Sequence, residues 1–281
     1  MNAIEIKNLT KRYPDFTLDA LDLTLPEGYI LGLIGENGAG KTTTMRLLLG
    51  MTKPDGGTAS VLGTDIGADL TAVKEEIGVV LGEPGLPDCL SAKDAGEIFK
   101  SLFKSWDKAL YASLLEKLDV PKDKSFKELS RGTRMKLGIA IALAHHPRLL
   151  LLDEPTSGLD PVVRDEVVGI FSDFTRDPGH SVLISSHIVS DLEKLCDYIA
   201  FLHKGRLMLC EEKDVLLGEY CIYRCEAEAL RALDPAAVVG KKESPYGVTA
   251  IVRRDALPAG ADFGPVTLEE LFIFMVKEDA T

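Results

Sequence analysis

The first segment able to do chemistry fits the pattern G-x-x-x-x-G-K-[ST] and consists of Gly35, Glu36, Asn37, Gly38, Ala39, Gly40, Lys41 and Thr42, with Thr43 following. Its glycines let the backbone curl so that successive N–H groups point inward, where the start of a helix adds its dipole. Lys41 supplies a mobile positive charge for the outer phosphates, and the Thr42 hydroxyl is placed to ligate Mg²⁺. An apolar run precedes the segment and a helical pattern follows it. This context favours a nucleoside triphosphate site over an ordinary glycine-rich turn.

A second pair of reactive side chains follows four consecutive leucines, at Asp153 and Glu154. Such an apolar run predicts a strand buried on both faces, and ligands bind at the carboxyl ends of strands in open α/β sheets. Asp153 would hold Mg²⁺, directly or through water. Glu154 would polarise a water for in-line attack on a γ-phosphate. The alternative is that both are solvated turn residues before Pro155.

The elements that must position these groups alternate between short apolar runs and longer segments of helical period, which is typical of a parallel sheet covered by helices. The apolar runs lie at 29–34, 149–152 and 181–184, and residues from about 88 to 146 read as a helical insertion. From residue 219 onward, strand-like alternation at 220–225 and 248–252 is followed by a helix opening at Thr267. We therefore predict an α/β domain over residues 1–218 and a small α+β C-terminal domain over 219–281. The apolar positions of the last helix, among them Leu268 and Leu271, are expected to form its own core rather than a partner-binding stripe.

The composition is that of an acidic globular protein. The chain has 281 residues and a formal net charge of −12, which would repel phosphate backbones and argues against nucleic acid as a partner. The densest apolar stretch, 137–144, is far shorter than the ~20 residues that a bilayer requires. No secretory signal is visible, and the five scattered cysteines suit a reducing compartment and indicate no metal or redox centre.

The order of motifs resembles that of the ATP-binding cassette ATPases. A segment Leu-Ser-Arg-Gly-Thr-Arg at 129–134 precedes the acidic strand, and Pro-Thr-Ser-Gly-Leu-Asp-Pro follows it at 155–161. The resemblance covers roughly residues 2 to 215. It implies a P-loop NTPase core with an antiparallel N-terminal β region. The segments 25–35 and 267–272 look like those of bacterial cassettes of the ABC-2 export type.

The resemblance also implies roles for individual residues. Ser130 and Gly132 would contact the γ-phosphate of ATP bound in a partner subunit, and Asp160 would cross the dimer interface. His187 matches the switch histidine that contacts the γ-phosphate and the attacking water, although it also reads as a surface histidine at a helix start. Tyr13 resembles the aromatic residue that stacks on adenine, and an ordinary packed tyrosine is the alternative. Independently of the family, Ser130 could cap a helix running through 135–144 and aim its dipole at an anion.

Three features depart from the family pattern: the residue after the strand at 77–81, the signature, and position 136. Gly82 stands where the family places a glutamine that reaches Mg²⁺ and the attacking water. Three alternatives follow: the Glu83 side chain takes the place of that glutamine, a water molecule takes it, or the site hydrolyses ATP slowly. In the signature, Arg131 and Thr133 replace the common glycine and glutamine. Lys136 replaces an arginine of many members, and we attach little to that change.

The resemblance predicts a homodimer, or a heterodimer with a related cassette, that powers export through a separate permease at the cytoplasmic face of the cell membrane. The permease would dock near 82–91 and the helical insertion. Two other functions stay open: a non-hydrolysing or slow ATP-binding regulatory module, and a non-transport cassette ATPase acting on DNA or ribosomes. A guanine-nucleotide switch is disfavoured because no Asn-Lys-x-Asp tetrapeptide is present.

Overall fold

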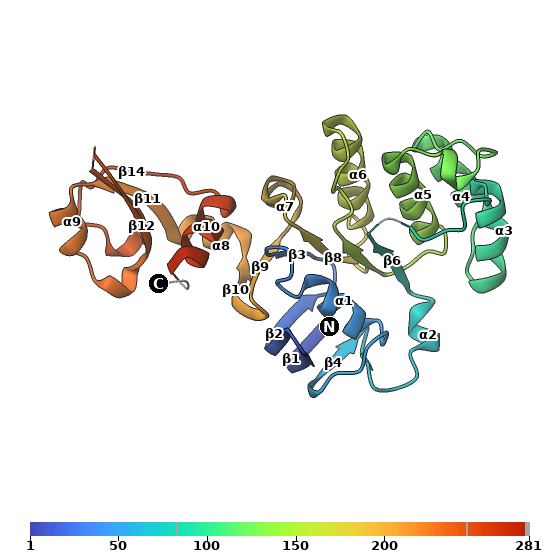
Figure 1. The fold of residues 1–281 in the computed structure, drawn as a ribbon, viewed down its shortest axis with the longest axis horizontal. Helices are drawn as coiled ribbons and strands as arrows, with labels where there is room; N and C mark the ends of the chain where they lie inside the picture. The colour runs from blue at the N-terminus through green and yellow to red at the C-terminus, as the bar shows by residue number, and fades with distance from the viewer. Residues whose placement is uncertain (83, 246, 279–281) are drawn as a thin grey trace. The chain divides into compact units, whose positions relative to one another are not determined.

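The computed structural model describes residues 1–82, 84–245 and 247–278. The chain folds into two compact units, Met1–Cys210 and Glu211–Thr281. The division falls before the predicted start of the second domain at residue 219, because helix α8 (Lys213–Glu219) packs against strand β11 (Tyr220–Cys225) of the second unit. Each unit has its own sheet and core, and Figure 1 traces the elements of both along the chain.

The centre of the first unit is a six-stranded sheet with the order β10-β9-β3-β8-β7-β6. Its strands are β3 (Ile30–Ile34), β6 (Ile77–Leu81), β7 (Leu149–Asp153), β8 (Ser181–Ser186), β9 (Tyr198–His203) and β10 (Arg206–Glu212). The pairs β6–β7, β7–β8, β8–β3 and β3–β9 are parallel, as the sequence predicts. Parallel pairing brings the carboxyl ends of these strands to one edge, where Asp153 stands opposite both Leu81 and Ser185.

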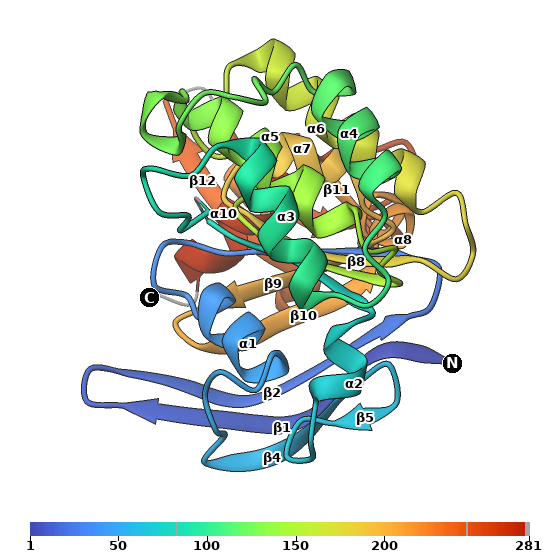
Figure 2. The same ribbon diagram turned by 90° about the vertical axis from the view of Figure 1, so that its right-hand side faces the viewer.

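A second, antiparallel sheet with the order β2-β1-β4-β5 confirms the predicted N-terminal β region. Its strands are β1 (Asn2–Tyr13), β2 (Phe16–Pro26), β4 (Gly56–Val61) and β5 (Thr64–Asp65). Helix α1 (Lys41–Leu48) lies between the two sheets (Figure 2) and contacts β4 of one and β7 of the other. The apolar side chains of both sheets and of α1 form one buried cluster, which fixes the loop that precedes α1.

The insertion between β6 and β7 is helical, as predicted. It contains α3 (Ala92–Leu102), α4 (Lys108–Lys117), a short 3₁₀ turn (Phe126–Glu128) and α5 (Arg131–Leu143). Ser130 caps α5 by accepting a hydrogen bond from the Thr133 backbone, which confirms the predicted cap. Three further helices belong to the first unit: α2 (Thr71–Lys74), α6 (Pro161–Phe174) and α7 (Val189–Leu195).

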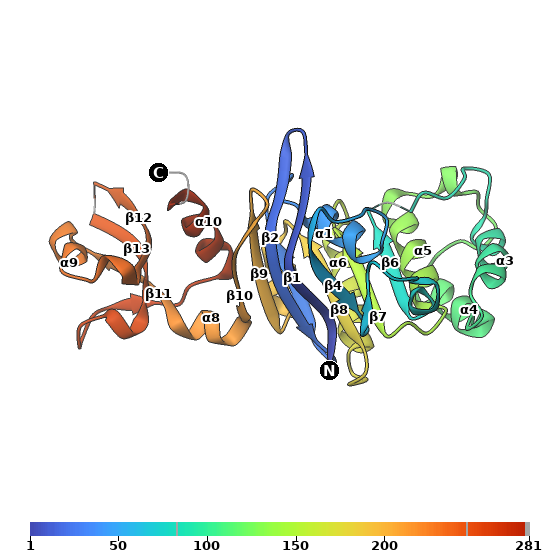
Figure 3. The same ribbon diagram turned by 90° about the horizontal axis from the view of Figure 1, so that it is seen from below.

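The second unit is a four-stranded sheet with the order β12-β13-β11-β14, and helices α9 and α10 lie on opposite faces of it (Figure 3). Its remaining elements are β11 (Tyr220–Cys225), α9 (Ala227–Arg231), β12 (Val238–Ser244), β13 (Gly247–Arg253), β14 (Phe263–Gly264) and α10 (Leu268–Glu278). Thr267 and Glu270 form the predicted capping box. Leu268 and Leu271 are fully buried, so these two apolar positions of α10 lie in the core of the unit.

None of the helices formed by the described residues has both the length and the apolar character needed to cross a membrane.

Candidate nucleotide-binding site

The loop between β3 and α1 curls around the side chain of Lys41, which is 6% exposed. Its Nζ donates to the carbonyl oxygens of Gly35, at 2.7 Å, and of Glu36, at 3.2 Å. Gly35 packs against the end of β9 so closely that a Cβ atom would lie 2.5 Å from the Leu202 carbonyl oxygen. The buried strand before the loop and the helix after it therefore hold a lysine ammonium among backbone groups, which is the arrangement of a phosphate-binding loop.

Asp153 ends the buried strand β7 and lies directly beside the start of α1. Its Oδ2 accepts a hydrogen bond of 2.6 Å from the Thr42 hydroxyl, and its Oδ1 accepts one of 2.5 Å from Ser185. The structure thus brings together the two side chains predicted to hold Mg²⁺. Ser185, at the end of β8, was not singled out in the sequence, since only the pairing of β7 with β8 places it next to Asp153.

Glu154 joins two of the predicted groups. Its Oε1 lies 3.2 Å from Lys41 Nζ, and its Oε2 lies 2.6 Å from His187 Nδ1. The backbone N–H of His187 also donates to Oε2, at 3.3 Å. Glu154 has a φ angle of 53°, a left-handed conformation that is uncommon for residues other than glycine and concentrates at functional sites. Its backbone N–H donates to Ser185, which holds the residue at the sheet edge.

A cavity of about 390 Å³ opens at this edge of the sheet. It is lined by Asp15, Phe16, Glu36, Asn37, Gly38, Gly40, Lys41, Thr42, Thr43, Asp153 and Glu154. Tyr13 does not line it. Across the β1–β2 hairpin, however, the Tyr13 ring stacks on Phe16, with ring centroids 6.4 Å apart. Asp15 and Phe16 were not among the residues predicted from the sequence. The three-residue spacing of Tyr13 and Phe16 could have indicated a hairpin with paired rings.

Ser130, Gly132 and Asp160 lie outside this cavity. Ser130 and Asp160 are exposed and cap α5 and α6 respectively. The two segments touch each other, because the Arg131 guanidinium lies over Gly158, where a Cβ atom would be 2.6 Å from Nη1. The fold therefore assembles one group of predicted residues around Lys41 and a separate group at the starts of α5 and α6.

Gly82 follows β6, and its backbone N–H donates to the Asp153 carbonyl oxygen at 3.1 Å. Its φ angle is +65°, and no atom lies within 4 Å of the place where a Cβ would be. A side chain here would have space but an unfavourable backbone conformation. Glu83, the neighbour considered as a substitute for the missing glutamine, lies outside the described residues.

Comparison with known proteins agrees with this geometry. A sequence model of the family described as "ABC transporter" matches residues 18–157. The bacitracin transport ATP-binding protein BcrA of Enterococcus faecalis is 36% identical over 208 residues, covering 73% of this chain and 68% of that protein. The Nod factor export ATP-binding protein I of Burkholderia orbicola is 32% identical, covering 98% and 87%.

Solved structures support the same fold. A dimeric ATP-binding cassette bound to ADP and phosphate superposes with a TM-score of 0.69 at 21% identity, covering 75% of this chain and 98% of the other. The ATP-binding subunit of an ABC transporter gives the same TM-score at 24% identity, covering 76% and 91%. The relatives confirm the resemblance to export-type cassettes, and the chain belongs to the ATP-binding subunits of the ABC transporter family.

Proposed function

We propose that two copies of this chain, or one copy and a related cassette, hold ATP between the Lys41 loop of one subunit and the Ser130 segment of the other. The separation of the two groups of residues supports this arrangement. The cavity beside Lys41 contains neither Ser130 nor Asp160, and both are exposed at helix starts that favour an anion or a partner surface. A second subunit facing the cavity would complete it with these groups. Phe16, with Tyr13 stacked behind it, supplies an aromatic wall for adenine.

In this proposal the reaction is the hydrolysis of ATP by water to ADP and phosphate, the ATPase activity of this family. The contact of Glu154 with both Lys41 and His187 is the observation that carries it. Glu154 accepts a proton from the attacking water. As it does so, the water oxygen bonds to the γ-phosphorus, and the bond between the γ-phosphorus and the bridging β-phosphate oxygen breaks. Lys41 neutralises charge that builds on the γ-phosphate, and His187 holds the Glu154 carboxylate in place.

The residues at the edge of the sheet fit a magnesium ion accompanying ATP. Thr42 Oγ1 and Asp153 Oδ2 lie 2.6 Å apart, and both are oxygen ligands of the kind that Mg²⁺ prefers. No group of three or more His, Cys, Asp or Glu side chains that could form a protein-only metal site occurs within 1–82, 84–245 and 247–278. This donor set suits an ion that takes its other ligands from phosphates and water. The ion would screen the phosphate charges during hydrolysis.

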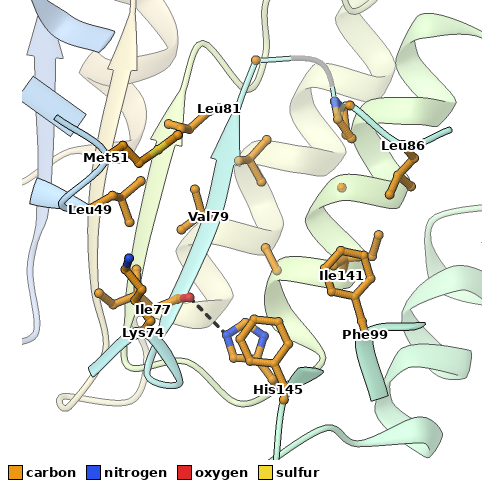
Figure 4. Close-up of a pocket in the computed structure, with 17 residues that line it drawn as sticks. Leu49, Met51, Lys74, Ile77, Val79, Leu81, Leu86, Phe99, Ile141 and His145 are labelled. Atoms are coloured by element: carbon orange, nitrogen blue, oxygen red, sulfur yellow. Dashed lines mark hydrogen bonds between the residues drawn. The ribbon is translucent and has the colours of Figure 1, made fainter. Parts of the chain in front are cut away.

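A second cavity, of about 490 Å³, is where we place the docking of a separate membrane permease (Figure 4). Its walls are largely apolar and come mainly from β6, α3, α5 and residues 84–86, and they include Leu86, Phe99 and Ile141. Gly82 belongs to the same wall, so the cavity adjoins the strand that ends beside Asp153. His145 Nε2 donates to the Ile77 carbonyl oxygen, and the His145 ring stacks on Phe103. Burial lowers the pKa of His145, which favours the neutral ring.

Export is the direction we propose, with the chain held at the cytoplasmic face of the membrane by this permease. Bacitracin transport and Nod factor export are functions of the relatives, and the cargo of this chain would be chosen by its own permease. A slow or non-hydrolysing regulatory module is a second candidate, favoured by one observation, the glycine at position 82.

Replacing Glu154 by Gln removes the proton acceptor while keeping its shape. We expect kcat for ATP hydrolysis to fall by about 10²–10⁴-fold, and ATP-dependent dimers to persist in size-exclusion chromatography. Glu166→Gln is the matched control, because Glu166 is exposed and pairs with Lys136 away from the cavity. Phosphate release by Glu154→Gln at the wild-type rate would exclude Glu154 as the base.

Gly82→Gln restores the glutamine of the family pattern at a backbone position of φ +65°. We expect turnover that is unchanged or lower and stability reduced by about 1–2 kcal/mol. Gly82→Ala separates the two effects, because alanine carries the same backbone strain without the amide. Higher phosphate release by the Gln variant than by the wild type would contradict a site adapted to glycine.

Leu86→Glu puts a charge into the apolar cavity, which would have to be desolvated when the permease docks. We expect the variant to lose co-purification with the permease encoded alongside it, while ATP binding persists because Leu86 lies outside the nucleotide cavity. Val215→Glu, at a residue 45% exposed in the second unit, is the control. Retention of the permease by Leu86→Glu would place the docking surface elsewhere.

A further inference from the structure

An ion pair with buried charged atoms connects helices α6 and α7. Arg164 Nε lies 3.7 Å from Asp191 Oδ2, and the side chains are 28% and 10% exposed. Both of these atoms are buried, and neither forms a hydrogen bond within the part of the chain that the structure describes. A buried carboxylate whose charge is balanced only by an arginine at 3.7 Å contributes little to the stability of the fold. A buried polar group without a hydrogen bond needs an explanation other than stability.

On the α6 side, the arginine is tied to the segment that carries Asp160. Arg164 Nη2 donates to the Leu159 carbonyl oxygen at 3.4 Å, and the Arg164 backbone N–H donates to the Asp160 carbonyl oxygen at 2.9 Å. Leu159 is buried, whereas Asp160 is exposed at the start of α6. A displacement of Asp160 by a partner subunit would therefore move the guanidinium of Arg164.

On the α7 side, the carboxylate belongs to the helix that begins just after His187. Asp191 lies in the first turn of α7, and its backbone N–H donates to the Ile188 carbonyl oxygen at 3.3 Å. His187, the residue before Ile188, contacts the Glu154 carboxylate through both its backbone N–H and its ring. The position of the first turn of α7 thus sets where the His187 ring meets Glu154.

We infer that Arg164 and Asp191 are positioning residues for hydrolysis, which couple the partner-facing Asp160 segment to His187. The inference rests on the proposed function, which places Asp160 at a subunit interface. Arg164 holds Asp191, Asp191 holds the first turn of α7, and that turn holds His187 against Glu154. The two residues touch neither ATP nor the attacking water, so their loss lowers the rate of hydrolysis without lowering the affinity for nucleotide.

The test compares Arg164→Ala, Asp191→Asn, their double variant and Asp191→Glu in the full-length protein. Arg176→Ala is the matched control, because Arg176 pairs with Asp173 at 3.1 Å on the exposed surface near the end of α6. We expect each single substitution to lower kcat by about ten-fold while KM for ATP changes by less than about two-fold. The double variant is expected to be no slower than either single variant, since both remove one link. Asp191→Glu keeps the charge and restores most of the activity.

A spectroscopic measurement tests the same link without hydrolysis. The imidazole NMR signal of His187, identified among the five histidines by its loss in His187→Ala, should shift in Arg164→Ala and Asp191→Asn and stay in place in Arg176→Ala. An unmoved His187 signal would overturn the inference, as would a kcat within about two-fold of the wild type in the single variants or a multiplicative loss in the double variant. Absence of hydrolysis by the wild type would instead contradict the proposed function, and the His187 signal would still decide the inference.

Discussion

The ion pair between Lys41 and Glu154, 3.2 Å from nitrogen to oxygen, is the contact on which the rest of the site depends. It joins a residue at the start of α1 to one at the end of β7, and it exists only because β3, β8 and β7 are parallel neighbours whose carboxyl ends meet at one edge. The same Lys41 ammonium is the group that we propose to bind the outer phosphates of ATP. In the proposed function, a γ-phosphate would compete with Glu154 for Lys41, and the displaced Glu154 carboxylate would then face the attacking water.

Around this contact, the fold keeps the chemistry apart from the surfaces that would control it. Asp153, Thr42 and Ser185 form a hydrogen-bonded group at the wall of the cavity, in which Asp153 and Ser185 are buried. The exposed starts of α5 and α6 carry the residues that we propose to face a partner subunit, and the apolar cavity beside β6 is the surface that we propose for a permease. The pairing of β6, β7 and β8 connects the apolar cavity to the Asp153 group, and the ion pair between Arg164 and Asp191 connects α6 to α7.

Sequence reasoning was most successful where function requires a short, contiguous pattern. The phosphate loop, the acidic end of β7, the helical insertion and the Ser130 cap all depend on local residue order, and the structure contains each of these elements. Features that arise from pairing between distant segments were not predictable. Phe16 is an exception, because it lies three positions from Tyr13 and this local spacing could have indicated the hairpin. Ser185, by contrast, reaches Asp153 only through the β7–β8 register. The left-handed conformation of Gly82 and the link between Arg164 and Asp191 likewise depend on tertiary packing.

Competition between Glu154 and the γ-phosphate for Lys41 can be measured directly by calorimetric titration with a non-hydrolysable ATP analogue and with ADP. The account predicts that Glu154→Gln, which removes the negative charge beside Lys41, binds the triphosphate analogue more tightly than the wild type does. Its affinity for ADP should change much less, because ADP has no γ-phosphate to take the place of the carboxylate. Weaker binding of the triphosphate analogue by Glu154→Gln, or an equal gain for both nucleotides, would contradict the account.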